Sequence, residues 1–397
     1  MRIALVSQAY PPIAGGGIST QTYAKAHGLA ALGHSIHVIA HSSDSARHEL
    51  WDGPVHVLRI PNIDSRLPIH TEPVRWLTYS TEIAAAVANL HAQIGLDLVD
   101  FPEYGAEGYV HLLNQTEWNH IPTVIHLHGP LVMLAHTIGW PDPDSEFYRV
   151  GTAMECTCLR LADAVFTSSR TSAAWCAQQY GLNVADAPVI HTGVDVGFFQ
   201  PLAAPKAARP TVIFVGKIVH NKGVECLVDA ACRVAAEFPG LHVRMLGPGD
   251  DRLVAKLLER AGAGGHPDLL EFAAFVPRME LPAHLARAHV FAAPSLYEGG
   301  PGFVYLEAMA CGLPVIACTG SGAAEVVIPG ENGLLAPPGD VDALAAALRQ
   351  LLGDATLRTA MGERARRYVL SEADSRVCIR RLESFYASVI AAARRRE

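Results

Sequence analysis

Two glutamates, Glu298 and Glu307, lie nine positions apart on either side of a glycine-proline turn in the stretch YEGGPGFVYLEAMACGLPVIA. In one continuous helix, nine steps of about 100° each would put the two carboxylates on opposite faces, so the turn must separate them. Because proline is favoured in the first turn of a helix, we predict a helix that begins at Pro301 or Gly302. The free N–H groups at its start, together with the helix dipole, favour a phosphate group.

Glu307 then lies about five residues, or roughly 7 Å, inside this helix, and its side chain leans back toward the phosphate end. It can bind the diol hydroxyls of a ribose, while Glu298 reaches a different part of the same ligand. The alternative for Glu307 is a surface glutamate on an amphipathic helix, and its apolar neighbours favour the binding role. The predicted phosphate cradle consists of Gly300, Pro301, Gly302, Phe303 and Val304.

Lys217 and Lys222 lie in the stretch VGKIVHNKG, where a predicted strand ends at Gly216 and a loop leads into a helix. Two cations at this place can neutralise a diphosphate as it leaves. Ordinary solvated lysines are the alternative, and the position of Lys217 beside a strand-end glycine favours the binding role. We assign Val276, the last residue of a predicted strand at 270–276, to the same ligand.

His128 ends the apolar strand TVIHLH, directly before a glycine and a proline. A histidine at a strand end can hydrogen-bond a substrate hydroxyl. His126 lies two residues earlier on the same face, and we predict a satisfied core histidine there. Glu103 and Tyr104, in FPEYG after another strand, are candidates for contact with a second substrate, and a turn or capping role is the alternative.

The elements that position these residues follow a repeated strand, loop, helix order. The first strand spans residues 2–7 and is followed by the loop PPIAGGG, a helix from about Ile18 to Gly33, and a second strand at 35–40. This order is a βαβ unit, which predicts a parallel sheet. Further strands are predicted at 97–101, 123–128 and 162–169.

A second series of strands follows a Pro/Ala-rich linker at 198–210 and is predicted at 211–217, 242–247, 270–276, 289–295 and 314–318. A chain of 397 residues exceeds what one hydrophobic core usually serves. We therefore predict an α/β protein with two Rossmann-like, doubly wound domains facing across a cleft that holds a nucleoside diphosphate. The predicted boundaries are 1–198, 199–372 and 373–397, the last being a C-terminal helix. Residues 365–397 as a whole are predicted to form two helices broken near 371–374.

Composition excludes several classes of protein. The net charge of −8 and the pI near 6.2 argue against non-specific nucleic-acid binding. The chain starts with neither a signal peptide nor a membrane span, so we expect a cytoplasmic protein with reduced cysteines and no metal site. The basic tail Arg394–Arg396 leaves peripheral contact with an anionic membrane face open, beside the commoner role of cations at a helix end.

Taken together, these segments resemble the retaining glycosyltransferases of family 4, which have the GT-B fold. The segments that carry the resemblance are, in chain order, PPIAGGG, GHSIHVIA, the strand-end His128, HTGVD at 191–195, VGKIVHNKG, PSLYEGGPGFVYLEAMACGLPVIA and GSGAAEVV at 320–327. One departure concerns the two glutamates, which have eight intervening residues where members usually have seven. A one-residue enlargement of a loop costs little, so we interpret it as a longer turn before the same helix.

The resemblance implies transfer of a hexose-type sugar from a nucleoside-diphosphate sugar to an acceptor hydroxyl of a glycan, lipid or small molecule, with retention and without a metal or other cofactor. It assigns the donor diphosphate to Lys217 and Lys222, the ribose to Glu307 and the donor sugar to Glu298. It places His128 near the reacting centre, and it implies a C-terminal helix that crosses back to the first domain. It also implies that Gly16 and Gly17 shape the loop closing over diphosphate and acceptor, with the acceptor on the side of Glu103 and Tyr104.

Two alternatives share the same fold. A nucleotide-sugar epimerase would bind the same donor without needing an acceptor. A non-catalytic sugar-nucleotide-binding protein would have no use for the lysine pair.

Overall fold

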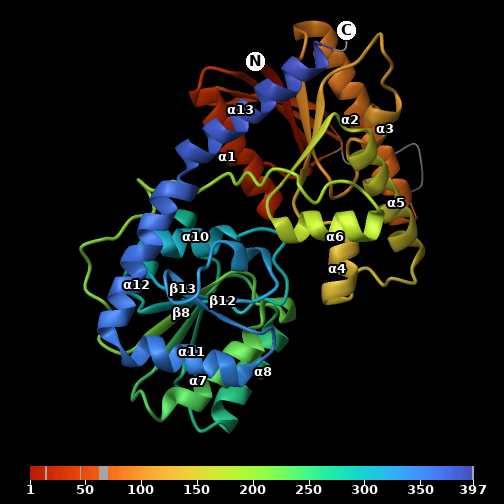
Figure 1. The fold of residues 1–397 in the computed structure, drawn as a ribbon. Coiled ribbons are helices and arrows are strands. Elements are labelled where there is room, and N and C mark those ends of the chain that lie inside the picture. The colour runs from red at the N-terminus through yellow and green to blue at the C-terminus, as the bar shows by residue number, and fades with distance from the viewer. Residues whose placement is uncertain (14–15, 45, 62–69, 396–397) are drawn as a thin grey trace. The chain divides into compact units, whose positions relative to one another are not determined.

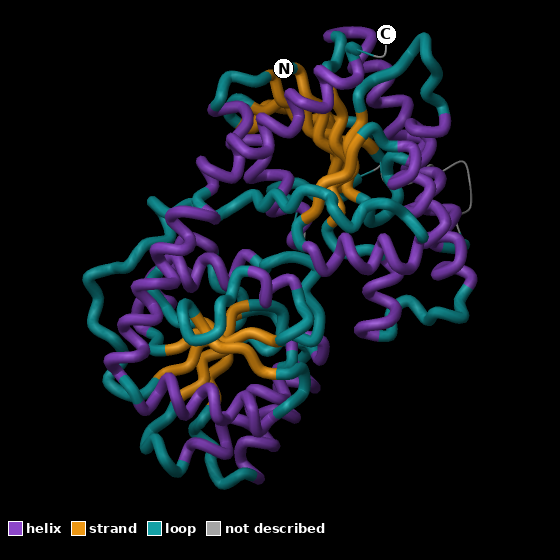
Figure 2. The backbone as a smooth tube through the Cα atoms, in the orientation of Figure 1, coloured by secondary structure: helices purple, strands orange, loops and turns teal. Residues whose placement is uncertain are grey.

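The computed structural model describes residues 1–13, 16–44, 46–61 and 70–395. The chain forms two compact units, and the first contains both ends of the chain, Met1–Thr192 and Ser375–Glu397. The second unit is Gly193–Asp374, so its limits lie six residues before and two residues after the limits of 199 and 372 drawn from the sequence. Each unit is built around one sheet flanked by helices (Figure 2).

The described part of the first unit has a seven-stranded sheet in the order β3-β4-β2-β1-β5-β6-β7. Its strands are β1 (Arg2–Ser7), β2 (Ser35–His41), β3 (His48–Asp52), β4 (Val55–Ile60), β5 (Leu98–Pro102), β6 (Thr123–Leu127) and β7 (Ala164–Thr167). The central strands are apolar runs because both of their faces are covered. The chain reverses its direction of winding between β1 and β5, and ligands of doubly wound sheets bind at such a point, beyond the carboxyl ends of the strands.

Helices cover both faces of this sheet. They are α1 (Gly17–Ala31), α2 (Glu72–Ile94), α3 (Tyr109–Leu113), α4 (Leu131–Ile138), α5 (Glu146–Leu161), α6 (Arg170–Tyr180) and α13 (Ser375–Ala393). The core on one face includes α1 and α13, which lie side by side (Figure 1). The core on the other face includes α2, α5 and α6. The C-terminal helix therefore packs on the first unit, as the resemblance implied.

The second unit, which is described throughout, has a six-stranded, all-parallel sheet in the order β10-β9-β8-β11-β12-β13. Its strands are β8 (Thr211–Val215), β9 (His242–Leu246), β10 (Leu270–Ala273), β11 (Val290–Ala292), β12 (Val315–Cys318) and β13 (Gly333–Ala336). Its α-helices are α7 (Val224–Ala235), α8 (Asp251–Ala263), α9 (Leu281–Arg287), α10 (Phe303–Ala310), α11 (Val341–Gly353) and α12 (Ala355–Tyr368). The short 3₁₀ turns are η1 (His220–Lys222), η2 (Arg278–Glu280) and η3 (Gly322–Glu325). The winding reverses between β8 and β11.

The helix break predicted at 371–374 is confirmed. Helix α12 passes into a π-helical turn, η4 (Val369–Ala373), before Asp374 adopts extended backbone and α13 begins. The N–H of Val194 donates to the carbonyl oxygen of Ala373 at 2.8 Å. The two ends of the second unit are thus joined to each other.

Three strands were not predicted from the sequence, namely β3, β4 and β13. Strand β3 is a mostly exposed edge strand and pairs antiparallel with β4, so the first sheet is not wholly parallel. Strand β4 contains the buried polar residues His56 and Arg59, which hide its apolar character. Strand β13 is only four residues long and follows a glycine-rich turn.

Candidate active site

Helix α10 begins at Phe303, one residue after the later of the two predicted starts, Pro301 and Gly302, and Gly302 caps it. Gly302 has a φ of 69°, and a Cβ atom at this position would lie 2.8 Å from the ring of Tyr305, so two separate constraints require glycine there. The N–H groups of Phe303 and Val304 are among the first of the helix, which have no intrahelical carbonyl partner. The helix start is thus within two residues of the predicted position, and phosphate binding by Gly300–Val304 stays a prediction.

Lys222 and Glu298 form an ion pair, with Nζ 2.6 Å from Oε1. The two loops that carry them are also joined through the backbone, because the N–H of Leu296 donates to the carbonyl oxygen of Asn221 at 2.9 Å. A Cβ atom on Gly223 would lie 2.0 Å from the carbonyl oxygen of Pro294. Lys222 follows β8 and Glu298 follows β11, so the pair lies at the reversal point of the second sheet.

The extra residue between Glu298 and Glu307 lies in a turn that rests on a neighbouring loop. The N–H of Gly322 donates to the carbonyl oxygen of Glu298 at 2.8 Å. A Cβ atom on Gly322 would come within 2.4 Å of the carbonyl oxygen of Gly300. The turn that contains the extra residue is therefore in close contact with the segment GSGAAEVV.

Glu307 is the fifth residue of α10, and only 2% of its surface is exposed. Its Oε1 lies 2.5 Å from a guanidinium nitrogen of Arg278, a residue that the sequence analysis missed. Burial raises the pKa of Glu307, and Arg278 opposes this shift without reversing it. Arg278 is half-exposed, and its guanidinium also lies 4.9 Å from the ring centre of Phe199. Arg278 is thus paired with the carboxylate that we predicted to bind a ribose.

The other predicted donor residues occupy different surroundings. The side chain of Lys217 is exposed after β8. The N–H of Gly216 donates to the carbonyl oxygen of Leu246, and a Cβ atom on Gly247 would lie 2.1 Å from the carbonyl oxygen of Gly216. Val276 is partly buried against the core of the second unit. Ligand contacts of these residues stay predictions.

In the first unit, His128 follows β6 and is buried, with 8% of its surface exposed. Its N–H donates to Oε2 of Glu103 at 2.8 Å, and its carbonyl oxygen accepts from the hydroxyl of Ser172 at 3.4 Å. Its ring packs on that of His126, with ring centres 3.7 Å apart. Within the described residues, Nδ1 of His128 has no hydrogen-bond partner. Burial, and then the charge of Lys25, hold the pKa of His128 well below its usual range, so the ring is neutral.

His126 belongs to a buried polar cluster, which confirms its prediction as a satisfied core histidine. Its Nε2 lies 2.9 Å from Oγ of Ser168, and its Nδ1 accepts from Nζ of Lys25 at 3.3 Å. Lys25 also pairs with Oδ2 of Asp100 at 2.6 Å, and the hydroxyl of Tyr386 on α13 donates to the same oxygen. The sequence analysis did not find Lys25, Asp100 or Tyr386, because each looks ordinary within its own segment.

Glu103 is fully buried, and its carboxylate accepts the N–H groups of His128 and Gly129. The structure thus gives it the turn role that the sequence analysis left as the alternative to acceptor contact. Tyr104 packs edge-on against Trp76, and burial raises its pKa to about 12. Contact of either residue with an acceptor stays a prediction.

Gly16 and Gly17 are exposed at the start of α1, and apart from their chain neighbours and the backbone of α1 itself, no described atom lies within 4 Å of a Cβ atom built on either. Ala14 and Gly15 of the same loop lie outside the described residues. The predicted role of this loop in closing over diphosphate and acceptor is therefore untested.

Comparisons with known proteins agree with this geometry. A family model described as Glycosyltransferase Family 4 matches residues 15–198, and one described as Glycosyl transferases group 1 matches residues 209–354. The GDP-mannose-dependent alpha-(1-6)-phosphatidylinositol monomannoside mannosyltransferase of Mycolicibacterium smegmatis is 30% identical over 285 residues, which cover 64% of this chain and 72% of that protein. This chain belongs to glycosyltransferase family 4.

Other relatives of this glycosyltransferase cover nearly its whole length. The glycogen synthase of Mycobacterium tuberculosis is 27% identical over 401 aligned positions, covering 94% of this chain and 91% of that protein. The structure of sucrose-phosphate synthase from Thermosynechococcus elongatus superposes with a TM-score of 0.82 at 24% identity, covering 98% of this chain and 99% of that one. The Anabaena protein HepE in complex with UDP-glucose superposes with a TM-score of 0.73 at 18% identity and covers 98% and 100%. These structures show that the fold is GT-B.

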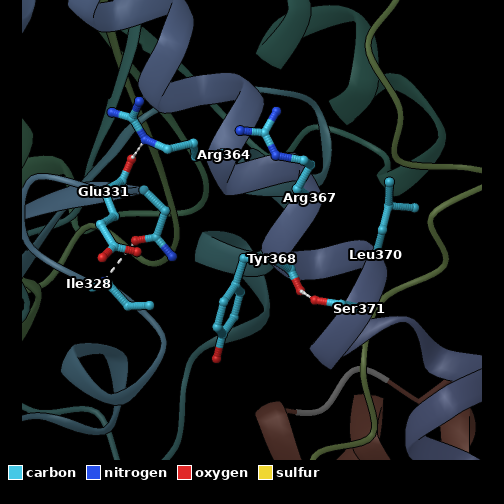
Figure 3. Close-up of a pocket in the computed structure, with 8 residues that line it drawn as sticks. Ile328, Glu331, Arg364, Arg367, Tyr368, Leu370 and Ser371 are labelled. Atoms are coloured by element: carbon cyan, nitrogen blue, oxygen red, sulfur yellow. Dashed lines mark hydrogen bonds between the residues drawn. The ribbon is translucent and has the colours of Figure 1, made fainter.

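A cavity of about 660 Å³ in the second unit of the glycosyltransferase is lined by none of the predicted residues (Figure 3). Its lining residues are Ile328, Glu331, Asn332, Arg364, Arg367, Tyr368, Leu370 and Ser371. Arg364 donates to the carbonyl oxygens of Gly330 and Glu331, and the amide oxygen of Asn332 accepts the N–H of Ile328. These groups hold the loop before β13 against α12.

Four further observations concern expectations drawn from the composition and the basic tail. All eight cysteines of the glycosyltransferase are free thiols. Within residues 1–13, 16–44, 46–61 and 70–395, no group of three or more His, Cys, Asp or Glu side chains is arranged to hold a metal ion. The described helices include none that is long and apolar enough to cross a membrane. In the basic tail, Arg394 lies 3.4 Å from Asp97, and Arg396 lies outside the described residues.

Proposed function

We propose that this glycosyltransferase moves a hexosyl group from a nucleoside-diphosphate sugar to an acceptor hydroxyl, with retention of anomeric configuration and without a metal ion. The observation that carries the proposal is the arrangement at the reversal point of the second sheet. There the Lys222–Glu298 pair follows β8 and β11, and α10 begins nearby with a glycine cap and a buried glutamate. A cation, free helix N–H groups and a carboxylate are the groups that a diphosphate and a ribose require.

The donor diphosphate would bind the N–H groups of Phe303 and Val304 and the ammonium groups of Lys217 and Lys222. In the structure Lys222 is neutralised by Glu298, and a diphosphate would compete for it. Glu298 would then be free to accept hydrogen bonds from hydroxyls of the donor sugar. The Lys222–Glu298 pair would thus bind both parts of the donor, the diphosphate through the lysine and the sugar through the glutamate.

Glu307 would accept hydrogen bonds from the two ribose hydroxyls. Arg278 now pairs with Glu307, and its half-exposed position lets it move aside or stay as a third partner of the carboxylate. Because Glu307 is almost completely buried, each hydrogen bond to it counts more than one on the surface. The ribose is therefore the part of the donor that we expect to set affinity.

In the reaction, the anomeric carbon loses its bond to the diphosphate oxygen and gains a bond to the acceptor oxygen on the same face. The acceptor proton passes to the leaving phosphate oxygen, so the products are the glycoside and the nucleoside diphosphate. Lys217, Lys222 and the start of α10 stabilise the negative charge that develops on the leaving group. His128, whose neutral ring has an unused Nδ1, would hydrogen-bond the donor sugar near its reacting carbon.

The relatives support the donor class without identifying the sugar. The name of the mycolicibacterial relative specifies GDP-mannose, and the Anabaena structure contains UDP-glucose. Both are nucleoside-diphosphate hexoses, which is the class that we propose here. The acceptor is a glycan, lipid or small-molecule hydroxyl.

The test is transfer from a panel of UDP-, GDP- and ADP-hexoses to a set of glycan, lipid and inositol-type acceptors, with and without EDTA. We expect transfer with one donor base, unchanged by EDTA, and an anomeric proton in the product with the coupling of the donor's own configuration. An inverted product, or activity abolished by EDTA and restored by a divalent cation, would refute that part of the proposal. Isomerisation of the donor without transfer would instead identify an epimerase.

A further inference from the structure

Segment 128–131, which carries His128, is held by carboxylates rather than by the usual backbone partners. Its proline has no N–H, and each of its three N–H groups donates to a buried glutamate. His128 and Gly129 donate to the two oxygens of Glu103. Leu131, the first residue of α4, donates to Oε2 of Glu155 at 2.9 Å.

The two glutamates reach this segment from different elements. Glu103 follows β5, and its own N–H donates to the carbonyl oxygen of His126 at 3.2 Å, so it is fixed to the neighbouring strand. Glu155 lies within α5, and its Oε2 also accepts from the hydroxyl of Tyr180 on α6 at 2.8 Å. Both glutamates are fully buried.

A buried carboxylate is costly in a fold, and a backbone N–H can bond a carbonyl oxygen or water at far lower cost. Two buried carboxylates that serve one four-residue segment therefore need a reason in function. The segment carries His128, the strand-end histidine that we assign to the reacting centre, and its Nδ1 has no hydrogen-bond partner within the described residues. Charge-assisted hydrogen bonds are shorter and stiffer than neutral ones, so they fix the backbone more firmly.

We propose that Glu103 and Glu155 are positioning residues that clamp segment 128–131 and thereby set the place of the His128 ring. This proposal rests on the proposed function for its effect on turnover, but the clamp itself is a property of the backbone and can be measured without a substrate. Neither glutamate needs to touch the donor or the acceptor.

The protonation state of Glu103 bears on the clamp. Burial raises the pKa of Glu103 to about 7, and the two N–H groups that it accepts partly offset this rise. The titratable groups facing it are Glu155, Cys176, Tyr104 and His128. Burial raises the pKa of Glu155, Cys176 and Tyr104, and it lowers the pKa of His128. With a pKa of about 7, Glu103 titrates near neutral pH, and its protonated form has one acceptor oxygen fewer for the clamp.

The experiment compares Glu103→Gln, Glu155→Gln and Glu107→Gln in the full chain. Glu107 is the matched control, because it is equally buried and shares the segment of Glu103, but in the described structure it makes no hydrogen bond to 128–131. Hydrogen exchange of the peptide that contains residues 128–131 is measured without ligand. Turnover and donor KM are measured with the best donor and acceptor over pH 5.5–9.

We expect faster exchange in 128–131 for Glu103→Gln and Glu155→Gln but not for Glu107→Gln. With the clamp loosened, kcat should fall roughly 10- to 100-fold, as expected for a small misplacement of a reacting group, while donor KM changes little. The wild-type kcat should fall as the pH drops below about 7, the pKa of Glu103, and this acid limb should be absent in Glu103→Gln. If Glu103→Gln fails to fold, Glu155→Gln, which keeps an acceptor oxygen, carries the exchange test.

Unchanged exchange in both clamp variants, or an equal effect of Glu107→Gln, would overturn the proposal. A lower kcat with unaltered hydrogen exchange would also overturn the proposal, because the glutamates would then affect turnover by a route other than the backbone of 128–131. If the wild-type protein transfers no sugar from any donor, the proposed function fails, and the exchange result still decides the clamp.

Discussion

Removing Arg278 gives the sharpest test of how the fold stabilises the buried carboxylate of Glu307 in α10. Arg278→Ala leaves the Glu307 carboxylate with 2% of its surface exposed and without its ion-pair partner. Glu307→Gln removes the charge and keeps the shape. The double variant removes both charges. The three variants together form a double-mutant cycle on one contact.

The magnitude follows from the geometry. Two unit charges about 4 Å apart attract by about 4 kcal/mol at an effective dielectric constant of 20. The guanidinium of Arg278 is 49% exposed, so water screens it, and we discount the loss on its removal to about 2 kcal/mol. Arg278→Ala should therefore destabilise the second unit by about 2 kcal/mol, whereas the double variant should lose less than about 1 kcal/mol, since no uncompensated charge is left.

Thermal unfolding and nucleotide binding are the two assays. For a unit of this size, about 2 kcal/mol corresponds to a fall of roughly 4–8 °C in the unfolding midpoint of Arg278→Ala. Glu307→Gln should unfold near the wild-type temperature. By calorimetry it should bind the donor nucleotide about 10- to 100-fold more weakly, because it loses charge-assisted hydrogen bonds worth about 1.5–3 kcal/mol.

Two results would refute this reasoning. If the double variant is as unstable as Arg278→Ala, the arginine stabilises through its packing on Phe199 and not through the charge of Glu307. If Glu307→Gln binds nucleotide as tightly as the wild type, the carboxylate does not hold the ribose. The first result would leave the proposed donor site unaffected. The second would remove the proposed contact between Glu307 and the ribose.

Lys222→Ala should lower kcat/KM for the donor by roughly 100-fold or more, as measured by steady-state transfer, because it removes a cation from the leaving diphosphate. His128→Ala should lower kcat by about 100-fold with donor KM within a few-fold of wild type, as initial rates will show. Burial raises the folded pKa of Glu103 from 4.5 to about 7, so wild-type stability should fall by about 3 kcal/mol as the pH rises from about 4.5 to 7, and this part of the fall should vanish in Glu103→Gln in urea titrations at pH 5 and 8. Tyr386→Phe removes a hydrogen bond to buried Asp100 and should cost about 1–2 kcal/mol by urea unfolding, with little effect on nucleotide binding.

Much of the fold could be predicted because the central strands of a doubly wound sheet are buried on both faces. Segments such as TVIFV at 211–215 are apolar throughout, and glycine-rich loops separate them from helices. The same argument fails at the sheet edges. Strand β3 is exposed, and β4 carries Arg59, whose guanidinium donates to the carbonyl oxygens of Tyr10 and Pro11. Such a buried arginine is indistinguishable from a surface residue until its partners are known.

The backbone elements of the candidate donor site could also largely be predicted, because the loops at strand ends and the start of α10 follow from local chemistry. The partner of Glu307 was not visible, because Arg278 lies 29 positions earlier in a different loop, and no periodicity links the two. Lys25 is a similar case. From the helix alone it would be interpreted as a solvated cation, and only the packed fold places its Nζ beside Asp100 and 3.3 Å from Nδ1 of His126.

The first unit has a core that draws on both ends of the chain. Its face with α1 buries Ile379, Leu382 and Tyr386 from α13 against residues of β1 and β2. During synthesis the second unit is complete once residue 374 has emerged, but the first cannot close this core until α13 follows. The first unit is therefore the first to be synthesised and the last to be completed. While residues 193–374 are being made, its apolar face is not yet covered by α13.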